Sequence, residues 1–116
     1  MKKILEDLDG FIQNNLPLIE AFEITKNKKE VIRLMALNMV ADSFKRIICS
    51  DHSDEQLQDV IKSTLDWLDN SGELYDTEEE EEICEQIMEI MDIVGLESSG
   101  GHLNIWRYGF DPNVGF

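Results

Sequence analysis

Carboxylates crowd the stretch from Asp76 to Asp92, and carboxylates are the side chains that bind Mg²⁺ or exchange protons in many enzymes. Five consecutive glutamates, Glu78 to Glu82, begin the run, and Glu85 and Glu89 follow before it ends. A magnesium site needs several such oxygens that converge on one pocket. The chemistry open to these residues therefore depends on whether one element carries all of them.

The apolar residues of the same stretch predict a single helix from Asp76 to Gly95. They recur at the spacing of one helical face: Ile83, Ile87, Ile90, Met91 and Val94. Thr77 and Glu80 have the spacing of a capping box, and Gly95 is typical of a helix end. The carboxylates then fall on the opposite face: Glu78, Glu81, Glu82, Glu85, Glu89 and Asp92.

The groups Glu81-Glu82-Ile83-Cys84-Glu85 and Glu89-Ile90-Met91-Asp92 superficially resemble the all-α nucleoside triphosphate pyrophosphohydrolases. Those enzymes carry a Glu-Glu-x-x-Glu group on one helix and a Glu-x-x-Asp group on another, and the two groups hold magnesium together. Here both groups share one helix, so they line its outer face and cannot enclose a metal between helices. A metal-dependent nucleotide pyrophosphohydrolase is therefore kept as the second alternative function.

The remaining residues show no pattern typical of catalysis. His52 and His102 are the two histidines, and neither has a second ligand at helical spacing. No nucleophile triad, phosphate-binding loop or nucleotide-binding glycine pattern is present. We therefore expect no enzyme, no catalytic residue, no metal and no cofactor.

The net charge of −15 is concentrated in one part of the chain. Residues 1–49 carry a net charge of +1, residues 50–99 carry −16, and residues 100–116 carry zero. Such an acidic segment repels phosphate, which disfavours direct contact with nucleic acid or anionic lipid. It favours a basic protein partner, or imitation of a nucleic acid.

The rest of the chain predicts an all-α bundle of four to five helices within one domain, 1–116. The bundle covers residues 1–97, and an extended aromatic C-terminal tail with at most one short strand, around Leu103 to Tyr108, covers residues 98–116. The expected helices before the acidic one are 2–15, a short one from Pro17 to Phe22, 28–49 and 54–69. Asn14, Asn15 and Pro17 interrupt the first pattern. Cys49 and Cys84 are predicted to be buried thiols.

The predicted location is the cytoplasm. No apolar run approaches the roughly 18–20 residues that span a membrane, and Glu6 and Asp7 come too early for a signal peptide.

The acidic side of the bundle, together with two tail aromatics, forms the candidate partner-binding surface. Acidic residues of helix 54–69 can share the side that the acidic helix exposes, and aromatic side chains make good interface anchors. The candidate residues are Asp59, Asp66, Asp69, Glu73, Asp76, Glu78, Glu81, Glu82, Glu85, Glu89, Asp92, Trp106 and Tyr108.

A small, strongly acidic helical chain without a catalytic signature resembles the bacterial immunity proteins of polymorphic toxin systems, such as those of contact-dependent growth inhibition. The resemblance rests on Glu78 to Glu82, Glu85, Glu89 and Asp92, on the approach from Asp66 to Asp76, and on size. It implies a cytoplasmic inhibitor that binds and neutralises a basic toxin nuclease domain. The first alternative is a nucleic-acid mimic that inhibits a DNA-binding enzyme.

Overall fold

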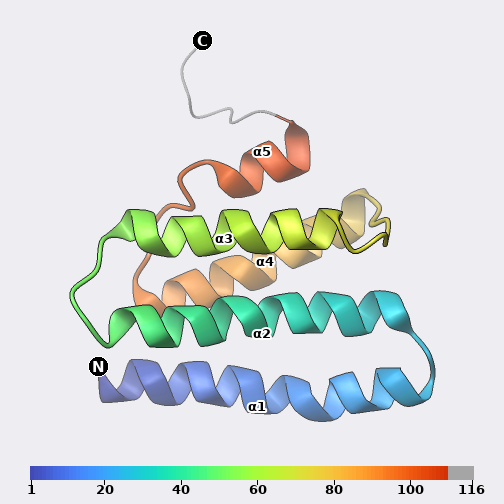
Figure 1. Cartoon of the computed structure of the whole chain (residues 1–116), viewed down its shortest axis with the longest axis horizontal. Helices are drawn as coiled ribbons and strands as arrows, with labels where there is room; N and C mark the ends of the chain where they lie inside the picture. Colours follow the sequence, from blue (N-terminus) through green and yellow to red (C-terminus); the bar gives the residue numbers. More distant parts are fainter. Residues whose placement is uncertain (110–116) are drawn as a thin grey trace.

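The computed structural model describes residues 1–109, which form five α-helices (Figure 1). The helices are α1 (Lys2–Ile24), α2 (Lys28–Ile48), α3 (Asp54–Asp69), α4 (Thr77–Val94) and α5 (His102–Tyr108). Over this described range no residue belongs to a strand. The prediction of an all-α bundle of four to five helices is therefore confirmed.

The bundle has two layers. Helices α1, α2 and α3 lie side by side, and α4 crosses behind them at an angle (Figure 1). Helix α2 contacts α1, α3 and α4, because it is apolar on most of its sides and therefore takes the central position. Leu37, Val40 and Phe44 of α2 are each at most 1% exposed.

The hydrophobic core fills the space between the layer and α4. Its fully buried side chains come from four helices: Leu8, Leu37, Val40, Phe44, Leu57, Ile61, Leu68, Ile83, Ile87 and Ile90. These are the residues that the helical periodicity assigns to one face of each amphipathic helix, so burial of their apolar surface drives the packing.

Helix α1 is continuous, so the predicted interruption at Asn14, Asn15 and Pro17 is wrong. Pro17 lies on the exposed side of the helix, and Gln13, whose carbonyl loses its usual N–H partner, is exposed to water as well. Asn15 is buried and donates a 2.9 Å hydrogen bond from Nδ2 to Oδ1 of Asn38 on α2. Asn15, which the sequence predicts at the end of a helix, instead joins α1 to α2.

The predicted caps hold for α2 and α3. The side chain of Asn27 accepts a 3.4 Å hydrogen bond from the N–H of Glu30 at the start of α2. The N–H of Ser53 donates a 2.8 Å hydrogen bond to Oε1 of Gln56 at the start of α3. Both helices agree with the predicted ranges within one residue at either end.

The capping box of α4 uses Asp76 and Glu79, one residue earlier than the predicted pair, Thr77 and Glu80. The Asp76 carboxylate accepts a 2.8 Å hydrogen bond from the N–H of Glu79, and Oε1 of Glu79 accepts one of 3.1 Å from the N–H of Asp76. A charged carboxylate interacts more favourably with a helix N-terminus than a hydroxyl does. Gly95 ends the helix with a φ of 75°, as expected.

Residues 102–108 are helical, so the prediction of an extended segment or a strand there is wrong. Helix α5 contacts both α3 and α4 (Figure 1). Leu103 is buried in the core and Trp106 is half-buried, three residues apart on one helical face. Residues 98–109 therefore belong to the bundle. The predicted tail residues Phe110 and Phe116 lie outside the described residues.

None of the helices in the described part of the chain has both the length and the apolar character that crossing a membrane requires.

Candidate protein-binding surface

The outer face of α4, which we call the acidic face, carries six exposed carboxylates. They are Glu78, Glu81, Glu82, Glu85, Glu89 and Asp92. The opposite side of the same helix is buried against the three-helix layer through Ile83, Ile87 and Ile90. The helical period therefore separates core residues from acidic residues, as the sequence indicates.

Four of the five basic residues of α2 bind carboxylates outside the acidic face. Lys29 donates to Glu79 at 2.5 Å, Arg33 pairs with Glu30, Lys45 pairs with Asp9 at 2.6 Å, and Arg46 pairs with Asp42 at 2.9 Å. Within residues 1–109, Glu82, Glu85 and Glu89 have no ion pair. Most of the acidic face therefore keeps its negative charge uncompensated.

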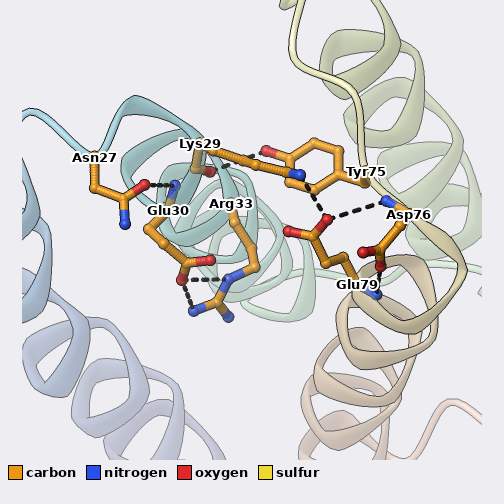
Figure 2. Close-up of polar contacts among 7 residues, drawn as sticks. All are labelled: Asn27, Lys29, Glu30, Arg33, Tyr75, Asp76 and Glu79. Atoms are coloured by element: carbon orange, nitrogen blue, oxygen red, sulfur yellow. Dashed lines mark hydrogen bonds and ion pairs between the residues drawn. The ribbon is translucent and has the colours of Figure 1, made fainter.

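Figure 2 shows where α2 meets the start of α4. Lys29 passes over the ring of Tyr75, which lies between α3 and α4, and reaches Glu79 (Figure 2). The hydrogen bond from Lys29 lowers the pKa of the Glu79 carboxyl, and the backbone of Asp76 contributes as well. Glu79 thus joins α2 to α4. The sequence does not distinguish it from the glutamates of the acidic face, which lie on the exposed side of the same helix.

The C-terminal helix compensates one end of the acidic face. Arg107 lies 3.3 Å from Oε2 of Glu81, and its guanidinium lies 4.7 Å from the centre of the Tyr108 ring. Burial, followed by the nearby charge of Asp69, raises the pKa of Glu80, although Arg107 opposes the shift. Carboxylates of α3 and α4 therefore influence each other at this corner.

The three candidate aspartates of α3 border two different hollows. Asp66 and Asp69 line a cleft between α3 and α5, and Asp69 accepts a 2.9 Å hydrogen bond from Nε1 of Trp106. Asp59 lines a groove between α2 and α3 together with Met39 and Trp67. Asp69 therefore lies beside α5, which in turn contacts α4, whereas Asp59 lies on the side of α3 that faces α2.

The other candidates occupy the link into α4 and the last turn of α5. Glu73 is half-buried, and its N–H donates to Oγ of Ser71. Asp76 is exposed but serves as the cap of α4. Trp106 is half-buried against α3, and Tyr108 is 50% exposed. Tyr108 is thus exposed, whereas Trp106 has both a packing contact and an accessible surface.

Among residues 1–109, no group of three or more His, Cys, Asp or Glu side chains is arranged to hold a metal ion. The Glu81, Glu82 and Glu85 side chains are exposed on a single helix. This is the arrangement expected from their spacing.

The two thiols differ, so the prediction that both are buried is wrong for Cys49. Cys49 is exposed at the end of α2, where its Sγ donates to the carbonyl oxygen of Lys45 at 3.2 Å. Cys84 is buried, and that burial raises the pKa of its thiol to about 11. Helical periodicity could not separate them, because Cys49 lies just past the last residue of its helix.

A family model described as "Domain of unknown function (DUF4844)" matches residues 11–111 of the chain. No curated protein and no solved structure matches the chain.

Proposed function

The chain belongs to the DUF4844 family, and from its surface we propose that it is an immunity protein, which binds and neutralises a basic toxin domain through the acidic face of α4. The residues that carry the proposal are Glu82, Glu85 and Glu89. Each is exposed, and each lacks an ion pair within the described residues. Repulsion among such carboxylates destabilises the free protein, and a basic partner would relieve it.

The ion pairs of the basic side chains support this proposal. Lys29, Arg33 and Lys45 lie on the central helix and are engaged by Glu79, Glu30 and Asp9. Within residues 1–109, the ion pair of Arg107 is with Glu81, at one end of the acidic face. A second molecule is therefore the natural source of positive charge for the middle of α4.

The proposed mechanism is imitation of substrate phosphates. A nuclease domain that binds a polyanion presents lysine and arginine side chains, and the carboxylates of α4 would occupy the positions where phosphates bind. Long-range attraction raises the association rate, whereas apolar contacts such as the exposed part of Tyr108 lower the dissociation rate.

The alternative of a nucleic-acid mimic has less support. A mimic of a duplex needs two long rows of regularly spaced charges, and α4 contributes one face of one helix. The aspartates of α3 border other hollows, with Asp59 directed toward α2 and Asp69 bound to Trp106.

The test compares wild-type protein with two charge-reversed variants of equal net charge. In the first, Glu82, Glu85 and Glu89 become lysine; in the control, the exposed Glu6, Asp7 and Glu20 of α1 become lysine. Proteins captured from the native host are identified, expressed, and measured for association rate at low salt.

We expect the α4 variant to associate at least about tenfold more slowly and the α1 control to change by less than about threefold. The wild-type protein, co-expressed with the captured domain, should also restore growth to cells which that domain kills. Equal rates for the two variants, or a captured domain with no toxicity, would contradict the proposal.

A further inference from the structure

The cleft between α3 and α5 combines an apolar wall with carboxylates at its rim. Its volume is about 370 Å³. Leu65, Ile105 and Trp106 supply apolar surface, and Ile105 remains 49% exposed. Asp66 and Asp69 lie on the α3 side, and both are exposed. A ligand for this cleft should therefore have an apolar stem and a cationic end.

At two places in this structure, a basic side chain lies over an aromatic ring and also binds a carboxylate. Lys29 lies 5.1 Å from the centre of the Tyr75 ring and 2.5 Å from Glu79. The guanidinium of Arg107 lies 4.7 Å from the centre of the Tyr108 ring, with a nitrogen 3.3 Å from Glu81. In both places the ring face and the carboxylate act on the same charge.

Trp106 and Asp69 also bring an aromatic ring and a carboxylate together, but no cation accompanies them in the described chain. The indole Nε1 of Trp106 donates to Oδ1 of Asp69 at 2.9 Å, which fixes the carboxylate at the edge of the ring. In the described chain no basic side chain lies over the Trp106 ring. Lys62, which lines the cleft, binds Asp66 at 3.2 Å in an exposed contact.

We propose that this cleft binds one arginine side chain of the basic partner, with the guanidinium stacked on Trp106 and bound to Asp69 and Asp66. Arginine fits better than lysine, because its planar group stacks on an indole and donates to two carboxylates at once. Its aliphatic stem covers Ile105. The inference rests on the proposed function, since it names the side chain by which the same basic partner is anchored next to the acidic face.

The test uses the full-length protein and small probes in place of the partner. Isotope-labelled protein is titrated with Nα-acetyl-arginine methylamide, and separately with the citrulline and lysine analogues, at constant ionic strength. The readout is the indole N–H resonance of Trp106, assigned as the signal that disappears in Trp106→Phe. We expect saturable shifts with the arginine compound in the millimolar range, weaker shifts with lysine, and none with citrulline.

Variants of α3 supply the controls. Asp69→Asn and Asp66→Asn should each weaken arginine binding, whereas Glu55→Gln, at the exposed start of the same helix and outside the cleft, should leave it unchanged. Lys62→Gln should strengthen binding about threefold, because it releases Asp66 from an exposed ion pair. Circular dichroism confirms that each variant is folded.

Binding of citrulline equal to that of arginine, or full binding by both aspartate variants, would overturn the inference. Lysine binding as tight as arginine binding would overturn the choice of guanidinium. The α4 variant with Glu82, Glu85 and Glu89 reversed should still shift the Trp106 signal. If the proposed function is wrong, that α4 variant should instead associate with the partner as fast as the wild-type protein does. The two failures therefore give different results.

Discussion

Tyr75 and Lys29 contact each other in two ways. The phenolic oxygen of Tyr75 donates a 3.0 Å hydrogen bond to the carbonyl oxygen of Lys29, and the ammonium of Lys29 lies 5.1 Å from the centre of the Tyr75 ring (Figure 2). The link between α3 and α4 is thereby tied to the first turn of α2. The same lysine continues to Glu79, so one side chain joins the link, α2 and α4.

The first prediction concerns the titration of Tyr75. Burial, reinforced by the charges of Glu73 and Glu30, raises its pKa to about 12. The variant Tyr108→Phe leaves Tyr75 as the single tyrosine, and its absorbance at 295 nm should follow a titration with a midpoint near pH 12. A midpoint near 10, the ordinary value, would show that the hydroxyl is free in solution.

Replacement of Tyr75 by phenylalanine should lower the free energy of unfolding by about 1 kcal/mol, the usual net contribution of one hydrogen bond. The pKa in the folded state exceeds that of the unfolded chain. The resulting stabilisation is therefore complete below about pH 10 and is lost as the pH rises toward 12. Urea unfolding at pH 8 and pH 11 should show a larger loss for wild type than for Tyr75→Phe.

The second prediction compares two neighbouring glutamates with opposite pKa shifts. Lys29 lowers the pKa of Glu79, so this carboxylate stabilises the fold above its unfolded pKa, and the stabilisation disappears as the pH falls through the folded value. Burial and Asp69 raise the pKa of Glu80, so its charge destabilises the fold at neutral pH and this cost disappears in acid.

At pH 7, Glu79→Gln should therefore lower the melting temperature and Glu80→Gln should raise it. Both differences should shrink when the same variants are melted at about pH 3.5, where the carboxyls become protonated. Equal and parallel effects of the two substitutions at neutral pH would refute the distinct environments of the two side chains.

The third prediction concerns salt. The melting temperature should rise from low salt to about 0.5 M NaCl, because screening shortens the range of repulsion on the acidic face. Neutralising Glu82, Glu85 and Glu89 with glutamine should raise the melting temperature at low salt and flatten the salt response. A melting temperature that falls with salt would mean that attraction dominates the surface, and the case for a basic partner would be lost.

The fourth prediction concerns the thiols. At pH 8 a colorimetric disulfide reagent should modify one thiol per native chain, because Cys49 is exposed and Cys84 is buried. With a pKa of about 11, Cys84 is roughly 0.1% thiolate at that pH. Cys49→Ser should abolish the fast reaction and Cys84→Ser should preserve it. Fast labelling of Cys49→Ser would show that α4 separates from the core in the native state.

Sequence periodicity predicted α2, α3 and α4 well because each helix carries local information for its own boundaries. Asn27, Ser53 and Gly95 are caps whose effect depends on nearby residues, and the apolar stripes are long enough to determine the period. The interruption predicted at Pro17 failed for a tertiary reason, since contact between Asn15 and Asn38 supports a helix that proline weakens locally.

Contacts between distant segments determine that α5 forms. They also determine that the candidate aspartates of α3 border two different hollows. Leu103 and Trp106 are three residues apart, which suits one turn of helix, and Gly101 and Gly109 bound the segment. Seven residues are too few for an isolated helix to be stable, so docking on α3 and α4 determines its conformation. The placement of Asp69 beside Trp106 follows from that docking, and periodicity within α3 could not supply it.

The position of α5 in the chain has a consequence for synthesis on the ribosome. The walls of the α3–α5 cleft are made in succession, since Asp69 leaves the exit tunnel well before Trp106. Helix α4 also precedes α5 in the chain, so its carboxylates leave the tunnel before the α3–α5 cleft can form. A basic protein can be attracted to such a chain, but retention through Trp106 and Asp69 has to wait until α5 has folded onto α3.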